Sequence, residues 1–289
     1  MTPRIASLTF AALIAFAANS LLGRMALGNS LQDPISFTAV RLLSGAIALI
    51  GLNAWLGENS RAERSEVFEG KSDSTGARWL PALWLFGYAI AFSLAYVTLS
   101  AATGALVLFG FVQLTMMLSA FLRGERLSMT RWLGFGIAVA GVVYLFLPGL
   151  TAPDPVGALL MSAAGIAWGL YSIAGRGAKT PIAMTTRNFV LALPFAAVCP
   201  LFALGKLEAT GLGLLLACVS GAVTSGGGYV LWYKVLPAFS TSQASVLQLS
   251  VPVIAAVGGV LFLGESLTIR LAVSSLLILG GIALSLQRR

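Results

Sequence analysis

The same Gly-Glu motif opens two apolar stretches of this chain, GERLSMTRWLGFGIAVAGVVYLF at residues 124–146 and GESLTIRLAVSSLLILGGIALSL at residues 264–286. Glycine and other small residues recur at matching places along both stretches, at a constant separation of 140 residues. Because the register holds for a whole helix, we interpret the two stretches as the last helices of two copies of one duplicated unit.

Two further matches extend the duplication toward the start of each copy. Residues 15–24, AFAANSLLGR, correspond to residues 167–176, AWGLYSIAGR. The dipeptide at residues 87–88, Gly-Tyr, corresponds to the one at residues 228–229. Leucine and alanine match each other in any pair of apolar helices, so chance similarity is the alternative explanation.

The composition indicates an integral membrane protein. Hydrophobic residues make up 58% of the 289 residues and charged residues only 10%, whereas soluble domains carry about one quarter charged residues. A helix needs about 20 mostly apolar residues to cross the hydrocarbon core, so ten helices fill nearly the whole chain. The apolar stretches predict spans at 5–23, 35–55, 79–99, 104–122, 132–148, 156–175, 184–204, 211–235, 242–263 and 270–286.

The expected fold is therefore all-α, with ten transmembrane helices arranged as two five-helix repeats, residues 1–150 and 151–289, around a central cavity. Five crossings per repeat is an odd number, so the two repeats must have opposite orientations in the membrane. The charges support this, because the loop around Glu125 holds three basic residues and the loop around Glu265 holds one. Inverted repeats of this kind are typical of secondary carriers, with the substrate near the bilayer midplane.

The distribution of basic residues predicts that both termini are cytoplasmic. With this orientation 13 Lys and Arg residues fall on the inside and three on the outside. The basic residues at the cytoplasmic side account for the net charge of +8, so the charge does not indicate nucleic acid as a partner. The first span resembles a secretory signal, but its counterpart in the second repeat favours a retained helix. Residues 57–78 are rich in charge, and we expect a mobile cytoplasmic loop there.

Enzymatic chemistry is not expected. The chain has no histidine, no acidic residue inside a predicted span, and two cysteines without CxxC spacing. These features argue against an intramembrane enzyme, a metal site, a disulfide framework or a cofactor. They also leave no membrane-embedded group for a proton relay, so we expect facilitated movement down the gradient of the substrate.

Two arginines, Arg41 and Arg187, are the only formal charges well inside predicted helices. A charge in the hydrocarbon core costs from about 2.5 kcal/mol upward, so each needs a partner. Either side chain could bond backbone carbonyls, reach a lipid phosphate or receive a substrate carboxylate. The symmetric repetition of the pair favours the structural role.

Aromatic and polar residues at repeat-related positions are the candidates for lining a cavity. A ring beside an amide or hydroxyl suits a solute with an apolar side and a polar end, although aromatic side chains also fill helix interfaces. The candidates are Phe16, Asn19, Ser20, Tyr88, Phe111, Trp168, Tyr171, Tyr229 and Gln248. Pro252 and Gly227 are candidates for a kink or a gate, with simple bending and close packing as the alternatives.

These features resemble the EamA-type carriers of the drug/metabolite transporter superfamily. The resemblance covers essentially the whole chain and rests on the Gly-Glu motif of each repeat, the glycine-rich fifth helix and the arginine in each second helix. The family proline in the fourth helix is present as Pro252 but replaced by Val112 in the first repeat. The resemblance implies that helices one, three and four of each repeat surround the cavity and that the fifth helices are peripheral.

The resemblance also implies an exporter of amino acids or related metabolites in the cytoplasmic (inner) membrane. The expected partners are a small-molecule substrate and membrane lipids, with the protein a monomer or a weak dimer. Export of drugs or other metabolites is the alternative substrate class. Nucleotide sugars are less favoured because a dianion would require more basic residues in the pathway. A receptor or scaffold without transport activity is the alternative from another class.

Overall fold

The computed structural model describes residues 2–55, 75–124, 128–175, 180–202, 207–239, 244 and 247–286. In the first half the helices are α1 (Pro3–Gly28), α2 (Pro34–Trp55), α4 (Thr75–Ala95), α5 (Ala101–Leu122) and α6 (Met129–Phe146). In the second half they are α7 (Pro155–Ala174), α8 (Pro181–Val198) with the 3-10 turn η1 (Cys199–Phe202), α9 (Gly211–Val219), the π-helix η2 (Ser220–Gly227), α10 (Gly228–Val235), the 3-10 turn η3 (Leu236–Ala238), α12 (Ser250–Leu263) and α13 (Ile269–Ser285).

These elements form ten helical spans over the described ranges, because the segments from α9 to η3 follow one another as one rod, Gly211–Ala238. Seven spans are long and apolar enough to cross a bilayer, and three shorter apolar helices accompany them. The prediction of an all-α protein with ten helices is confirmed.

Polar residues set the helix starts. Ser100, Ser128, Asp154 and Thr268 each accept a hydrogen bond from the backbone N–H three residues ahead, which satisfies one of the free donors of the first turn. The Ser100 cap explains why α5 begins at Ala101, three residues before the predicted span.

Several predicted boundaries were wrong by about a turn. Helix α1 continues to Gly28 rather than ending at residue 23. Helix α4 ends at Ala95 rather than at residue 99. It also begins at Thr75, so the last residues of the predicted 57–78 loop are helical; residues 56–74 lie outside the described part of the chain.

The helix pairings have the two-fold pattern of an inverted duplication. Helix α4, the third span of the first repeat, packs against α7, the first span of the second repeat. In the same way η2 and α10, in the third span of the second repeat, pack against α1, the first span of the first repeat. Helix α5 likewise packs against α7, and α12 packs against α1. The fifth helices α6 and α13 pair with each other.

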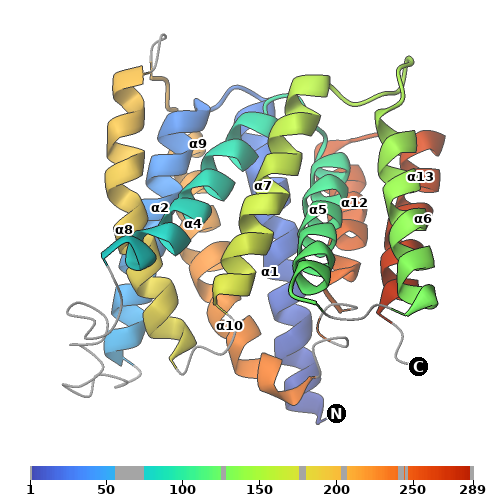
Figure 1. The fold of residues 1–289 in the computed structure, drawn as a ribbon. Helices are drawn as coiled ribbons and strands as arrows, with labels where there is room; N and C mark the ends of the chain where they lie inside the picture. The colour runs from blue at the N-terminus through green and yellow to red at the C-terminus, as the bar shows by residue number, and fades with distance from the viewer. Residues whose placement is uncertain are drawn as a thin grey trace.

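The turns that follow the fourth helices lie at opposite ends of the bundle. Gly124 follows the C-terminus of α5, whereas Glu265 accepts a hydrogen bond from the N–H of Ala101 at the N-terminus of the same helix. Figure 1 shows the same inversion, with α1 rising from the lower side and α7 descending toward it, and with both termini on the lower side.

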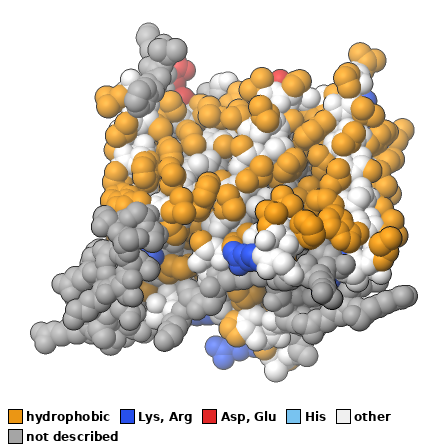
Figure 2. Space-filling view, in the orientation of Figure 1, with side chains coloured by type: hydrophobic (Ala, Val, Ile, Leu, Met, Phe, Trp, Pro, Cys, Tyr) orange, Lys and Arg blue, Asp and Glu red, His pale blue; other side chains and the backbone are white. Residues whose placement is uncertain are grey.

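Apolar side chains cover the outside of the bundle between its two ends. Large residues such as Ile47, Leu159 and Leu276 are more than 60% exposed. In Figure 2 orange side chains cover the middle of the visible face, while blue side chains gather toward the lower edge and red ones at the upper edge. An apolar belt between two polar margins is the surface of a multi-pass membrane protein.

The α6–α13 pair is held together backbone to backbone. A Cβ at Gly134 would clash with the carbonyl oxygen of Gly281, and a Cβ at Gly281 would lie 2.6 Å from the amide nitrogen of Ala138. Figure 1 places the pair at the right edge of the bundle. The fifth helices are therefore peripheral, as the resemblance implied.

Candidate transport site

A small cavity lies between the two halves of the bundle. Its free volume is about 20 Å³, room for little more than one water molecule. Ligand sites usually measure about 300–1,000 Å³, so this conformation is contracted around the site. The lining residues come from both repeats: Phe16, Asn19, Ser20, Tyr88, Leu108, Phe109, Trp168, Thr224, Ser225, Tyr229 and Gln248.

One side of the cavity is polar and centres on Asn19 of α1. Its side-chain oxygen accepts a hydrogen bond from the Ser220 hydroxyl at 2.7 Å and lies 3.3 Å from the Thr224 hydroxyl. Its amide nitrogen donates to the Tyr88 hydroxyl at 3.3 Å. Asn19 is buried, and these partners fix its amide and tie α1 to both α4 and η2.

Arg41 of α2 lies directly behind this polar side. One terminal nitrogen donates to the Tyr88 hydroxyl at 2.8 Å, and Nε donates to Ser225 over a longer 3.4 Å. The guanidinium carbon lies 5.1 Å from the ring centre of Tyr88 and 4.6 Å from that of Phe92. Arg41 is 2% exposed, so the cavity has a buried positive charge one hydrogen bond from its lining.

The π-helix η2 brings the polar residues of the second repeat to this side. Its hydrogen bonds close over five residues instead of four, so Ser220 and Ser225 share a face, whereas in an α-helix they would point about 140° apart. Gly221 lets η2 approach α2 closely, since a Cβ there would clash with the carbonyl oxygen of Arg41. Ser220 therefore contacts Asn19 while Ser225 contacts Arg41.

Another part of the cavity lining is aromatic. Trp168 of α7 stacks on Tyr229 of α10, with ring centres 5.1 Å apart and planes inclined by 28°. Tyr88 lies 4.8 Å from Trp168, and Phe16 lies 6.0 Å from Tyr229. These four rings come from four different helices and include two of the repeat-related pairs singled out from the sequence.

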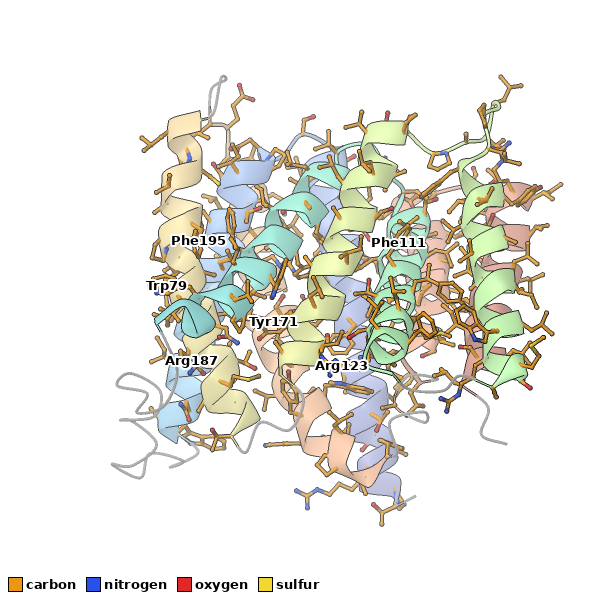
Figure 3. The ribbon with its side chains drawn as sticks, in the orientation of Figure 1. Trp79, Phe111, Arg123, Tyr171, Arg187 and Phe195 are labelled. Atoms are coloured by element: carbon orange, nitrogen blue, oxygen red, sulfur yellow. The ribbon has the colours of Figure 1, made fainter. Side chains whose placement is uncertain are left out.

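Seven of the nine predicted cavity residues line the cavity together: Phe16, Asn19, Ser20, Tyr88, Trp168, Tyr229 and Gln248. The other two do not. Phe111 faces Gly165 of α7, and Tyr171 is buried beside Trp168 with ring centres 5.2 Å apart, outside the lining. Figure 3 shows Phe111 on α5 and Tyr171 lower on α7.

Arg187, Gly227 and Pro252 also lie away from the cavity lining. Arg187 is half-buried near the lower end of α8, and its Nε has no hydrogen-bond partner among the described residues. Gly227 ends η2, and a Cβ there would meet no atom closer than 3.7 Å. Pro252 is in the first turn of α12, where its missing N–H breaks no hydrogen bond within that helix, and it lines a separate apolar cavity between α5 and α13.

Sequence reasoning missed three residues of the polar side: Ser220, Thr224 and Ser225. Ser220 and Thr224 share a face on an α-helix, but Ser225 falls about 140° from Ser220, and the π geometry that brings it to the same side has no simple sequence signal. Leu108 and Phe109 were also missed, because they sit in a continuously apolar stretch of α5.

One end of the bundle is bridged by polar contacts between the two halves. Arg24 of α1 pairs with Glu265 at 3.4 Å and donates to the carbonyl oxygens of Tyr96 and Val97. Both carboxylate oxygens of Glu265 lie 2.9 Å from the N–H of Ala101. The repeat counterparts of this ion pair, Arg176 and Glu125, lie outside the described residues.

A second set of contacts joins the halves at the same end. The backbone N–H of Asp33 donates to the carbonyl oxygen of Glu208 at 2.8 Å, and the N–H of Glu208 donates back to the Asp33 carboxylate at 3.1 Å. These contacts join the α1–α2 turn to residues 207–210 ahead of α9, at the same end of the bundle as the Arg24–Glu265 pair.

An apolar bundle of ten helices with a cavity between two inverted halves is the architecture of a membrane carrier. The family model of the EamA-like transporter family matches residues 4–147 and 155–287. The chain belongs to the EamA-like transporter family, whose members are transporters and not enzymes. Its partners therefore include a small-molecule substrate and membrane lipids.

Individual proteins agree with this assignment. "Uncharacterized protein PA1977" of Pseudomonas aeruginosa is 48% identical over 284 residues, which cover 98% of this chain and 94% of the relative. An "Uncharacterized transporter" of Archaeoglobus fulgidus is 29% identical over 218 residues, 72% of this chain and 77% of the relative. A solved structure titled "Crystal structure of protein" superposes with a TM-score of 0.67 at 20% identity, covering 99% of this chain and 98% of its own, which supports the fold alone.

Proposed function

We propose that this transporter exports small amphipathic metabolites, with amino acids as the leading class, across the cytoplasmic membrane by alternating access. The observation that carries the proposal is the division of the cavity into a polar side around Asn19 and an aromatic side around Trp168 and Tyr229. A solute with one polar end and one apolar side matches both sides.

The contracted state of the cavity fits an alternating-access cycle. A free volume of about 20 Å³ cannot hold an amino acid, so the halves must separate to admit one. The polar contacts around Arg24 and Glu265 hold one end closed, and loading from the opposite end requires no change in them. With both termini in the cytoplasm, as the basic residues favour, the closed end is the outer one.

We also propose that transport is facilitative. The residues that line the cavity include no aspartate, glutamate or histidine, and the described acidic residues, Asp33, Asp154, Glu208 and Glu265, all lie at or beyond helix ends. A proton relay normally uses such a group at membrane depth. Accumulation of substrate in proteoliposomes in response to a pH gradient would contradict this.

Exchange of labelled amino acids by the purified protein in liposomes tests the proposal. We expect Trp168→Ala and Asn19→Ala to lower flux and raise KM, because each removes one side of the cavity. Trp132→Ala is the matched control, since Trp132 packs on Phe121 and Phe135 at the periphery. If the wild type does not exchange amino acids, the proposed substrate is wrong. If both cavity variants keep the kinetics of the wild type, the proposed site is wrong.

A further inference from the structure

The positive charge of Arg41 is not balanced by any carboxylate among the described residues. The one ion pair described is Arg24–Glu265, and the other described acidic residues, Asp33, Asp154 and Glu208, are in turns that precede helices. Arg41 instead lies beside the adjacent rings of Tyr88 and Phe92 on α4, which stabilise a cation without neutralising it. A buried guanidinium in this setting gains strongly from an anion.

Arg41 also has unused donors. The guanidinium carries five N–H groups, and it makes two hydrogen bonds, the weaker one to Ser225 at 3.4 Å. Its second terminal nitrogen is fully buried and has no partner among the described residues. Snorkelling does not satisfy this nitrogen in the observed conformation, because the side chain is only 2% exposed.

The hydroxyl proton of Tyr88 is a second donor without a partner beside the cavity. Its oxygen accepts hydrogen bonds from Asn19 at 3.3 Å and from Arg41 at 2.8 Å. With the Asn19 amide in this orientation neither partner atom accepts a proton in return, so the O–H of Tyr88 is free to donate to another acceptor. It donates to no described protein group, and Tyr88 lines the cavity.

We propose that Arg41 and Tyr88 form a carboxylate-binding site at the polar side of the cavity. One carboxylate oxygen of the substrate accepts the Tyr88 proton, and the other accepts a hydrogen bond from the unpaired terminal nitrogen of Arg41, which lies beside the terminal nitrogen that bonds Tyr88. The proposal rests on the proposed function and narrows it, because the substrate is then an acid with an apolar body rather than an amine, an ester or a neutral drug.

The aromatic side accounts for the rest of such a substrate. The body of the acid packs against Trp168 and Tyr229, and an ammonium group, where present, lies over the same rings. The lining residues hold no fixed negative charge for an ammonium, so the carboxylate carries most of the recognition.

Competition against labelled leucine in proteoliposomes tests the site without any mutation. The competitors are leucine, 4-methylpentanoate, leucine methyl ester and 3-methylbutylamine, which keep the side chain and vary the two charged groups. We expect both carboxylates to inhibit and the ester and the amine to need at least about tenfold higher concentrations, because they lose charge-assisted hydrogen bonds. Equal inhibition by leucine and its methyl ester would overturn the proposal.

Two variants test whether Arg41 and Tyr88 cause the preference for the acid over its methyl ester. In Tyr88→Phe, which keeps the ring, and in Arg41→Gln, the acid-to-ester preference should fall to within about threefold, because inhibition by the acid weakens more than inhibition by the ester. Tyr144→Phe on peripheral α6 is the control for losing a hydroxyl. If Arg41→Gln does not fold, Tyr88→Phe still decides, and a preference preserved in Tyr88→Phe would overturn the proposal.

The two levels of inference fail separately. In one outcome no labelled amino acid exchanges, but 4-methylpentanoate and leucine stabilise the purified wild type against heat, whereas the methyl ester and the amine do not. In that case the carboxylate site stands and the proposal of amino-acid transport is wrong. If amino acids exchange but ester and acid compete equally, transport stands and the carboxylate site is wrong.

Discussion

Arg41 and Arg187 occupy the same place in the two repeats but have different surroundings. Arg41 is buried, bonded to Tyr88 and Ser225 and in contact with the rings of Tyr88 and Phe92. Arg187 is half-buried at the other end of the bundle and lies outside the cavity lining. The duplication therefore provided a symmetric scaffold, and divergence of side chains turned one of two equivalent arginines toward a single polar site.

The same divergence separates Asn19 from its counterpart Tyr171. Asn19 joins three elements around the cavity, whereas Tyr171 packs beside Trp168 outside it. Both repeats contribute to each side of the cavity, but at this pair of equivalent positions only Asn19 reaches the polar side.

The largest expected effect tests the inversion on which this comparison depends. Met129 and Ile269 are 140 residues apart, occupy equivalent positions and are both more than 80% exposed. In a background with Cys199 and Cys218 replaced by alanine, we expect Ile269→Cys, but not Met129→Cys, to react in intact cells with a membrane-impermeant thiol reagent. Labelling of both positions from the same side of the membrane would contradict the inverted orientation of the two repeats.

A second prediction tests how tightly η2 is packed behind Arg41. We expect Gly221→Ala to lower the unfolding temperature of the detergent-solubilised protein markedly, because overpacking at a backbone contact costs about 1–3 kcal/mol. Gly227→Ala in the same π-helix is the control and should have little effect, since nothing lies within 3.7 Å of the added methyl. Equal stability of the two variants would show that this contact does not hold α2 and η2 together.

Much of the fold could be predicted from the sequence, because hydrophobic length and the positions of charges dictate which segments cross a membrane. Most predicted spans agree with the helices to within three or four residues. The errors came from local chemistry that hydropathy ignores, as at Ser100, whose side chain starts α5 earlier than the apolar stretch suggests.

The candidate site was predicted in part, through the repeat. Residues such as Phe16, Asn19 and Trp168 were found because paired polar and aromatic positions are unusual within apolar helices. Helical spacing fixes which residues share a face but not how that face is rotated in the bundle, so Tyr171 was included although it lies outside the lining. The different environments of Arg41 and Arg187 depend on tertiary contacts that the repeat cannot distinguish.

A third prediction compares the two arginines directly. Arg187→Gln should change amino-acid flux less than Arg41→Gln does, and it should leave the preference for a carboxylate over its methyl ester intact. The reason is that Arg187 is outside the lining, whereas Arg41 is one hydrogen bond from it. A loss of preference in Arg187→Gln would instead mean that both repeats contribute a cation to the substrate.

The smallest expected effect concerns the closed end near Arg41. Glu265→Gln keeps an acceptor for the N–H of Ala101 but removes the charge that pairs with Arg24. We expect transport to become modestly faster, by about two- to fivefold, because partly exposed ion pairs contribute only about 0–1 kcal/mol. Slower transport in Glu265→Gln, measured beside Glu265→Ala, would indicate that the pair is needed in another state of the cycle.

The π-helix at Ser220–Gly227 places one extra residue in a turn of the eighth span. Moving this wide turn along the helix requires less rearrangement than removing it. If the wide turn moved toward α10, the segment that it passed would revert to α geometry and revolve by about 100°. Ser225 would then swing off the guanidinium while the rest of the rod kept its axis. A wide turn in the backbone ladder would thus allow a local rotation beside Arg41.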